Sequence, residues 1–337
     1  MISRLIDDAL EARALDPDSL RPVLRAALHG ELSDVQLAGL LVTLRFLPPT
    51  GELLAGAVLE TLRLQHGVVG RRDAAVDGCG TGGDGAGTFN VSTAAALVAA
   101  ACGAQVVKHG NRGVSSKSGS ADALEALGVP IEFGASEAER ALAKHDFVFL
   151  FAPRFHPSLA HVGPVRRELG VRTLFNLMGP LLNPAGVERQ VIGVASDADA
   201  EVVGEACRIL GRRRVLVVHC DGLDEFGLHA PTRGFRIEEG ERSPFEFDPR
   251  AAGLPEVRPE ELVVDGPAAS AARIERVLRG EDEPGQAIVA LNAGALLFVA
   301  GQVERIEDGY ALAREGLTAG RALELLERLR GAREVVA

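Results

Sequence analysis

The chain has 337 residues, 47% of them apolar, and carries 47 acidic against 36 basic side chains, a formal net charge of −11. This length exceeds what one small hydrophobic core supports, so we expect one large domain together with a smaller one. The acidic balance disfavours nucleic acids and anionic membranes as partners, because both are bound through accumulated positive charge. Local basic clusters can still bind a small anion.

Lysine and asparagine are unusually rare. There are three lysines (Lys108, Lys117 and Lys144) and five asparagines, so 33 of the 36 basic residues are arginines. A coding sequence poor in A and T would replace Lys by Arg, and Asn by other polar residues, wherever the chemistry permits. Each retained Lys or Asn is therefore more informative than usual about a functional site.

The four cysteines are widely spaced, with no Cys-x-x-Cys pair. This spacing is typical neither of a disulfide framework nor of a zinc site, and it favours a protein of a reducing, cytoplasmic compartment. The first eight residues turn acidic where a signal peptide would stay apolar, so we expect none. The Ala-rich stretches 94–107 and 287–300 are shorter than the roughly 20 residues of a membrane span and are expected to be buried.

The elements follow one another in a clear order. Residues 1 to about 66 have apolar side chains at helical spacing in three or four short segments, and residues 66–73 form a hinge. Strands then alternate with helices, which favours a parallel sheet. Strands are expected at 74–79, 104–107, 147–151, 190–194 and 215–219 and a hairpin at 234–247. Helices are expected at 92–102, 121–127, 198–210 and from 268 onward, and one begins at the capping box Ser136-x-x-Glu139.

This order predicts an α/β protein in which a small N-terminal all-helical domain joins a larger α/β domain with a mainly parallel central sheet. The helical domain is expected over residues 1–68, joined by helices from about 157–182. The α/β domain is expected over residues 72–337.

A glycine-rich loop follows the first strand. Six glycines occur within residues 78–87, and Asn90, Ser92 and Thr93 follow at the start of a helix. Glycines let the backbone approach a ligand and point several N–H groups at one anion, and a helix N-terminus also favours negative charge. The loop is neither a dinucleotide fingerprint nor a Walker loop. It predicts a phosphate site, with an ordinary flexible turn as the alternative.

A second polar loop follows the next strand. The segment Lys108-His-Gly-Asn-Arg-Gly-Val-Ser-Ser-Lys-Ser-Gly-Ser120 holds two of the three lysines, one asparagine and four serines. In a doubly wound sheet both loops open at the carboxyl ends of neighbouring strands, where ligands bind. Together they suit a ligand with more than one phosphate.

Two further clusters complete the picture. Asp221-Gly-Leu-Asp-Glu225 follows a strand, and beside a polyphosphate such carboxylates favour Mg²⁺. Arg166 lies on an expected helix and can grip a carboxylate through two parallel hydrogen bonds. His156 and His161, nearby, are expected to be structural.

These stretches in combination resemble the anthranilate phosphoribosyltransferase family, whose members join anthranilate to phosphoribosyl pyrophosphate (PRPP) in tryptophan biosynthesis. The likeness rests on Gly80-Thr-Gly-Gly-Asp84, Lys108-His-Gly-Asn-Arg112 with Ser115-Ser-Lys-Ser-Gly-Ser120, and Asp224-Glu225, and it covers essentially the whole chain. The chain departs from the commoner pattern at Gly113, at Ser158-Leu-Ala160 and at Phe226-Gly227. The resemblance implies a helical domain on a larger α/β domain, paired into a homodimer through the helical parts.

The resemblance also implies site residues. Anthranilate would contact Gly80, Asn111 and Arg166, and two Mg²⁺ ions would be held by Ser92, Asp224 and Glu225 together with the diphosphate. No residue is assigned as an acid or base, because the attacking arylamine is already neutral. The PRPP site would comprise Gly80, Gly83, Asp84, Thr88, Asn90, Val91, Ser92, Thr93, Lys108, His109, Gly110, Asn111, Arg112, Gly113, Val114, Ser115, Ser116 and Ser120.

Two other functions stay open. A pyrimidine-type nucleoside phosphorylase would share the fold and a variant of the Lys/Ser loop, but it lacks the Gly-Pro-Leu-x-Asn-Pro pattern found here at 179–184. A non-catalytic relative that binds nucleic acid is opposed by the net charge of −11 and by the intact Asp224-Glu225 pair.

Overall fold

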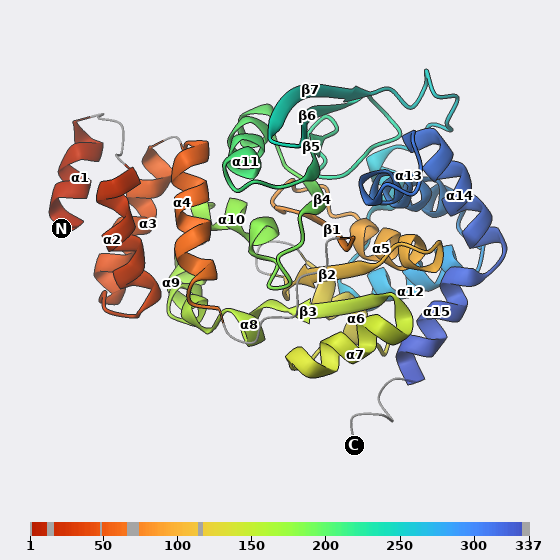
Figure 1. The fold of residues 1–337 in the computed structure, drawn as a ribbon, viewed down its shortest axis with the longest axis horizontal. Coiled ribbons are helices and arrows are strands. Elements are labelled where there is room, and N and C mark those ends of the chain that lie inside the picture. Colours follow the sequence, from red (N-terminus) through yellow and green to blue (C-terminus); the bar gives the residue numbers. More distant parts are fainter. Residues whose placement is uncertain (1, 12–16, 48, 66–73, 114–116, 332–337) are drawn as a thin grey trace.

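The computed structural model describes residues 2–11, 17–47, 49–65, 74–113 and 117–331. Figure 1 shows a group of N-terminal helices beside a twisted sheet that has helices on both sides. The hinge predicted at 66–73 lies outside the described residues.

The described residues up to position 65 form four helices, within the three or four segments that the apolar spacing predicts. Helix α3 begins at a capping box in which Ser33 Oγ accepts from the Gln36 amide at 3.3 Å and Gln36 Oε1 accepts from the Ser33 amide at 3.0 Å. Two helices from much later in the chain pack on α3 and α4. The group consists of α1 (Ile2–Leu10), α2 (Pro17–Leu28), α3 (Asp34–Phe46), α4 (Gly51–Leu62), α9 (Val162–Leu169) and α10 (Leu174–Met178).

The sheet has seven strands in the order β3-β2-β1-β4-β5-β6-β7. The first five are mutually parallel, and β6 and β7 form the antiparallel hairpin at one edge. The prediction of a mainly parallel sheet is therefore confirmed. The strands are β1 (Val76–Gly80), β2 (Val106–Gly110), β3 (Phe147–Phe151), β4 (Arg189–Gly193), β5 (Arg214–His219), β6 (Thr232–Glu238) and β7 (Glu241–Phe247).

Both faces of the sheet are covered. In β5, Leu216 and Val218 belong to the core that includes α5 and α13, whereas Val215 and Val217 belong to the core that includes α11 and the N-terminal helices. Successive side chains of a strand point to opposite faces, so a strand buried on both faces is a continuous apolar run. The remaining helices are α5 (Val91–Ala101), α6 (Ser120–Ala126), α7 (Ala135–His145), α8 (Ala152–Phe155), α11 (Asp197–Ile209), α12 (Pro267–Leu278), α13 (Glu283–Ala300), α14 (Ile306–Thr318) and α15 (Arg321–Arg330), with short 3₁₀ turns η1 (Pro157–Ala160), η2 (Gly179–Leu182) and η3 (Pro259–Leu262).

Helix α13 lies in the centre of the larger core. By length and composition it could cross a membrane, and it is the one helix among the described residues that passes this test. However, 83% of it is buried inside the protein. It is a core helix, as expected for the 287–300 stretch.

The capping box predicted at Ser136 is wrong. Helix α7 begins directly after Gly134, and the Gly134 amide donates to Glu137 Oε2 at 2.7 Å. Glu137 is the third helical residue, and its side chain accepts from the N-cap amide as in a capping box. Gly134 has no side-chain oxygen that could accept from the Glu137 amide in return. The hydrogen bond to the N-cap amide is therefore made by Glu137, not by the predicted Glu139.

The N-terminal helices and the sheet share a core. Leu54 of α4 belongs to the same buried cluster as Val203 of α11 and Val217 of β5. Gly51 lies so close to α11 that a Cβ there would be 2.5 Å from Glu205 Cγ. The division of the chain at residues 68 and 72 stays a prediction, because buried side chains run across it.

Candidate active site

Three predicted loops meet at the carboxyl ends of the strands. The glycine loop follows β1. The second polar loop, which is the Lys/Ser loop that leads to Ser120, follows the adjacent β2. The acidic loop, residues 221–225, follows β5. The Gly82 amide donates to Asp224 Oδ2 at 2.7 Å, and the Ser92 amide donates to Glu225 Oε1 at 3.0 Å. The structure thus brings together Ser92, Asp224 and Glu225, the three residues predicted to hold metal.

Glycine is required where the acidic loop crosses the sheet edge. A Cβ at Gly80 would lie 2.1 Å from Asp224 Oδ2, and one at Gly193 would lie 1.6 Å from the Asp224 carbonyl oxygen. A side chain at Gly193 would therefore require the backbone of Asp224 to move, and one at Gly80 would displace the Asp224 carboxylate. The glycine loop continues through Gly82 and Gly83. Their φ angles are 69° and 80°, which glycine adopts without strain.

The site is electrostatically prepared for a cation. Burial raises the pKa of Asp224 to about 7, and the nearby Asp84 adds to the effect. Burial likewise raises the pKa of Glu225 to about 8, with a further contribution from Asp224. Carboxylates that repel one another in a buried site gain stability when a positive ion lies between them.

These residues fit Mg²⁺ in a particular way. Mg²⁺ takes oxygen ligands and is commonly held by one or two carboxylates plus substrate phosphates. Asp224 and Glu225 with the Ser92 hydroxyl supply such oxygens. Within the described part of the chain, no three His, Cys, Asp or Glu side chains are grouped so as to hold a metal alone. In the predicted arrangement, a substrate diphosphate would supply further oxygen ligands.

The two lysines predicted in the second loop lie in different environments. The placement of Lys108 in the loop is wrong, because β2 runs to Gly110 and includes it. Lys108 is buried, and its Nζ donates to the Gly78 carbonyl at 2.5 Å and to Ser92 Oγ at 3.4 Å. Its charge lowers the pKa of Glu225, against the larger effect of burial. Lys117 is exposed and pairs with Asp265 at 2.9 Å. Lys108 thus belongs to the floor of the site and Lys117 to the rim.

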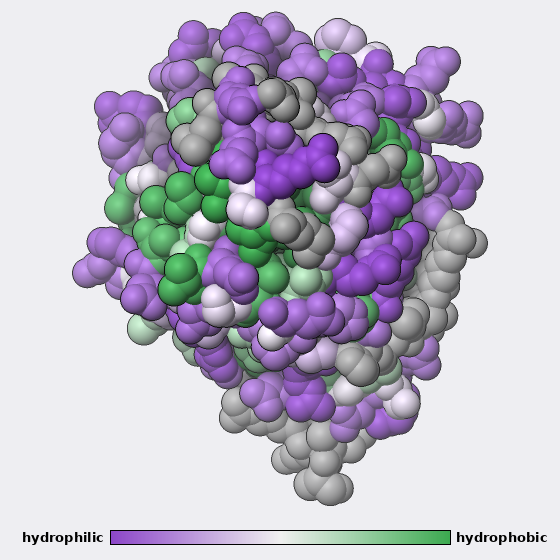
Figure 2. Space-filling view, turned by 90° about the vertical axis from the view of Figure 1, so that its left-hand side faces the viewer, coloured by the Kyte–Doolittle hydropathy of each residue, from purple (hydrophilic) through white to green (hydrophobic). Residues whose placement is uncertain are grey.

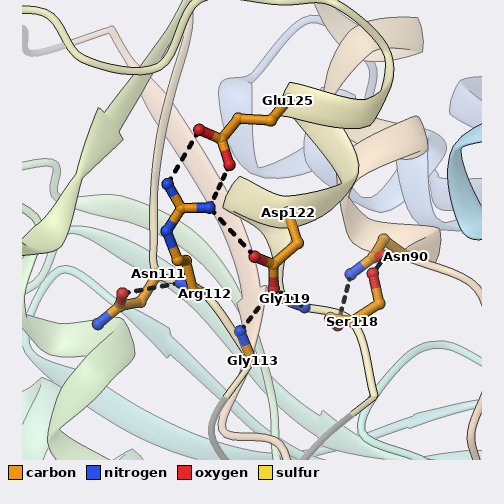
Figure 3. A network of polar contacts seen from close by, with 8 residues as sticks. All are labelled: Asn90, Asn111, Arg112, Gly113, Ser118, Gly119, Asp122 and Glu125. Carbon is orange, nitrogen blue, oxygen red and sulfur yellow. Dashed lines mark hydrogen bonds and ion pairs between the residues drawn. The ribbon is translucent and has the colours of Figure 1, made fainter. Parts of the chain in front are cut away.

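The second loop is held in shape mainly by carboxylates of α6, the helix that follows it (Figure 3). Asp122 Oδ2 accepts from the Gly113 amide at 2.8 Å and from the Gly119 amide at 3.0 Å. Arg112 reaches away from the loop tip to Asp122 and Glu125. The Asn111 side chain accepts from the Arg112 amide at 2.7 Å. Val114, Ser115 and Ser116 lie outside the described residues.

Asn90 joins the two loops. Its Nδ2 donates to the Ser118 carbonyl at 3.1 Å (Figure 3). Its Oδ1 accepts from the hydroxyls of Ser118 at 2.8 Å and Ser270 at 2.7 Å. The Asn90 side chain therefore fixes one loop against the other. Its direct contact with PRPP stays a prediction, as does that of Arg112.

Several other predicted PRPP residues have inaccessible side chains. Val91, Thr93 and His109 are buried, so backbone groups are what they present to a ligand. Burial, with the neighbouring His156, lowers the pKa of His109 to about 3, which keeps its ring neutral. Thr88 forms an isolated bridge with Val263. A Cβ at Gly110 would be 2.1 Å from Ser120 Oγ, which places these two predicted residues in contact.

Arg166 has the properties of a carboxylate-binding residue. It lies in α9, half-buried, with its guanidinium 5.7 Å from the centre of the Phe175 ring. Burial lowers its pKa from the usual value. Among the described residues no carboxylate pairs with it, so its charge is available to a ligand. No described contact joins Arg166 to Gly80 or Asn111, and their common anthranilate site stays a prediction.

Comparison with known proteins adds to this geometry. The model of the glycosyl transferase family, a/b domain, matches residues 72–323. An anthranilate phosphoribosyltransferase from Geobacillus kaustophilus is 45% identical over 338 residues, covering 100% of this chain and 99% of that relative. The chain belongs to the anthranilate phosphoribosyltransferase family.

Solved structures of anthranilate phosphoribosyltransferases agree. The one from Thermus thermophilus is 43% identical with a TM-score of 0.88, covering 97% of this chain and 98% of that one. The one from Saccharomyces cerevisiae in complex with PRPP and Mg is 27% identical with a TM-score of 0.88, covering 98% and 97%. Family membership makes the chain a glycosyltransferase with the fold predicted from its sequence.

One departure from the commoner anthranilate phosphoribosyltransferase pattern has a clear structural role. Phe226 is fully buried, and its ring packs edge-on against Phe245 and Phe247. Its amide donates to Asn292 Oδ1, and its carbonyl accepts from Asn292 Nδ2, both at 3.0 Å. The backbone directly after Glu225 is thereby attached to α13.

Two features were missed by sequence reasoning. The buried Asp77 accepts from Asn183 Nδ2 at 2.9 Å, beneath both phosphate loops. The rarity of asparagine was a usable signal for Asn183. Arg172 lies against the glycine loop at Gly83, and in a chain with 33 arginines nothing in the sequence distinguishes it.

Proposed function

We propose that this chain transfers the phosphoribosyl group of PRPP to the amine of anthranilate, releasing pyrophosphate, in tryptophan biosynthesis. The observation that carries the proposal is the hydrogen-bonded junction of the acidic loop with the glycine loop and the start of α5, beside Lys108. It occurs in a chain 45% identical over its whole length to an anthranilate phosphoribosyltransferase.

In the reaction, the amine nitrogen forms a bond to ribose C1 while the bond from C1 to the diphosphate oxygen breaks. The electron pair stays on the departing pyrophosphate, and the amine releases one proton to the solvent. Amide groups of the glycine loop and the start of α5 bind the diphosphate, with the donor residues predicted above. When bound, Mg²⁺ would stabilise the negative charge of the leaving group. Two ions per subunit would be held by Ser92, Asp224 and Glu225 together with the diphosphate.

The acceptor needs positioning more than activation. A neutral arylamine already has its nucleophilic electron pair, so holding it at the correct distance lowers the barrier most. Arg166 binds the carboxylate of anthranilate, and Asn111 orients the amine. The burial of Arg166 strengthens this contact, because an ion pair is screened less away from water.

We also propose a homodimer formed through the helical end. Val35 (83% exposed), Val42 and Phe46 (70% exposed) lie along α3, and Leu59 lies on α4. Figure 2 views the end of the molecule with these helices and shows hydrophobic residues gathered on part of it. A second copy would cover this surface. The four free cysteines and the pathway fit a cytoplasmic location.

Incubation with PRPP, Mg²⁺ and anthranilate tests the function. We expect the fluorescence of anthranilate to fall with time, and only when all three are present. Absence of turnover, together with phosphate-dependent release of a base from a nucleoside, would instead assign the nucleoside phosphorylase activity. Binding of nucleic acid that weakens with added salt, seen as a shift in its gel mobility and without either enzymatic activity, would instead assign the function of a non-catalytic nucleic-acid-binding relative.

A further inference from the structure

Arg172 occupies a junction between three parts of the molecule. It lies in the short connection between α9 and α10, after Gly170, whose φ of 64° ends α9. Its side chain is partly buried and reaches the glycine loop from this connection. On its far side is Asp199, in the first turn of α11.

The Arg172 side chain lies close to the backbone of the glycine loop at Gly83. A Cβ built on Gly83 would be 3.1 Å from both Cδ and Nε of Arg172 and 3.2 Å from Cζ. The guanidinium therefore packs directly on the backbone at Gly83. One residue earlier, the Gly82 amide donates to Asp224 at 2.7 Å. The loop is thus held at Gly82 by the acidic loop and at Gly83 by Arg172.

The guanidinium is only loosely bound by protein groups. Its Nη2 is 3.6 Å from Asp199 Oδ2, an ion pair beyond hydrogen-bond distance. The same buried nitrogen has no hydrogen-bond partner among the described residues. A buried donor without a partner is costly unless a ligand or water completes it. The positive charge also acts on Asp224, whose pKa it lowers against the larger effect of burial.

We propose that Arg172 is a positioning residue for the diphosphate of the donor: it holds the glycine loop at Gly83, in the conformation in which the loop amides and Asp224 face the same ligand. Asp199 of α11 supplies a negative charge 3.6 Å from the guanidinium. Arg172 thus acts on the donor site, whereas Arg166, six residues earlier on α9, acts on the acceptor. This inference rests on the proposed function.

Calorimetric binding of Mg²⁺ and inorganic pyrophosphate tests it without turnover. Arg172→Ala is expected to weaken pyrophosphate binding roughly tenfold, the size of one lost charge-assisted contact. Arg172→Lys keeps the charge and should recover part of the loss, and Asp199→Asn should weaken binding less than Arg172→Ala. In turnover, the KM for PRPP should rise while kcat and the KM for anthranilate change little.

Arg167→Ala is the matched control, because Arg167 is an exposed arginine on the neighbouring helix. It should bind pyrophosphate like the wild type, and all variants should keep the wild-type Tm within a few degrees. Wild-type binding in Arg172→Ala would overturn the inference, as would a rise in the KM for anthranilate alone. A wild-type protein that binds no pyrophosphate would instead contradict the proposed function.

Discussion

The amide of Ser92 donates a hydrogen bond to Glu225 Oε1 at 3.0 Å, and this contact joins the first turn of α5 to a loop 133 residues away. It holds Glu225 beside the hydroxyl of Ser92, so that carboxylate and hydroxyl oxygens face the same small volume. The proposed metal chemistry depends on this arrangement.

The double variant Asp224→Asn, Glu225→Gln should lose most activity at ordinary Mg²⁺ concentrations. Removing both carboxylates would remove the ligands that hold Mg²⁺, so the leaving group would lack the counter-charge of the ion. The expected loss in kcat is on the order of 100-fold or more. Steady-state turnover against Mg²⁺ concentration measures it. Asp221→Asn is the control, since Asp221 is exposed in the same loop and its φ of 48° suits asparagine. Near-normal turnover in the double variant would remove the metal role.

Asp224 and Glu225 should contribute progressively less to the stability of the metal-free protein as the pH rises from about 4 to about 8. Burial raises the pKa of Asp224 to about 7 and of Glu225 to about 8, above their ordinary values of 3.8 and 4.5. The folded state therefore holds protons that the unfolded state has released, so stability present at low pH is lost through this range. Thermal unfolding at a series of pH values checks the trend. It should be flatter in the double variant, and an equal slope in both proteins would contradict the assignment.

Arg166→Ala should raise the KM for anthranilate at least tenfold, as expected when a carboxylate loses a charge-assisted partner. The KM for PRPP should change far less. Initial rates with each substrate varied in turn separate the two effects. Arg166→Lys should recover only part of the loss, because an ammonium cannot make the paired contacts of a guanidinium. Equal effects on both substrates would show that Arg166 is not the acceptor clamp.

Asn183→Ala should destabilise the fold by about 2–3 kcal/mol, because it removes the donor at 2.9 Å from the buried Asp77 side chain and the donor at 2.8 Å from the Val107 carbonyl. Asp77 would keep the longer bond from the His109 amide at 3.4 Å. Denaturant unfolding measures the change in the free energy of unfolding. Asp77→Asn and the combined variant complete a double-mutant cycle. A coupling free energy near zero would mean that the Asn183 to Asp77 hydrogen bond contributes nothing.

Phe46→Asp should disrupt the proposed dimer, because it introduces a charge into an apolar face that a second copy would bury. Sedimentation should show a dimer for the wild type and a monomer for the variant. Val263→Asp is the control, since Val263 is also exposed but lies outside the helical group. A monomeric wild type would refute the dimer.

Much of the fold was predictable because local patterns and tertiary structure agree. The apolar run from Phe147 to Phe151 is β3 to the residue, and the strand, glycine loop and helix around residues 76–101 follow in the expected order. The start of α7 was misassigned, since Glu137 and Glu139 each lie three residues after a possible cap and only the folded contact distinguishes them.

The site was predictable only in part for a related reason. Scarce residues such as Lys108 and Asn90 marked the region of the two predicted phosphate loops. The structure places Lys108 within β2 and Asn90 at the start of α5, each beside one of these loops. Their partners were not predictable, because Asn90 meets Ser270 at a separation of 180 residues. Arg172 matters through its position beside Gly83, and no local pattern encodes that contact.

The attachment of Phe226 to Asn292 has a consequence for how the site opens. Both backbone groups of Phe226 are bonded to a side chain of α13, the central helix of the larger core. The acidic loop cannot leave its place unless this core also opens, so its local opening costs nearly as much free energy as global unfolding. Hydrogen exchange at the Phe226 amide should therefore be as slow as in the core itself, although the adjacent residue is a proposed metal ligand.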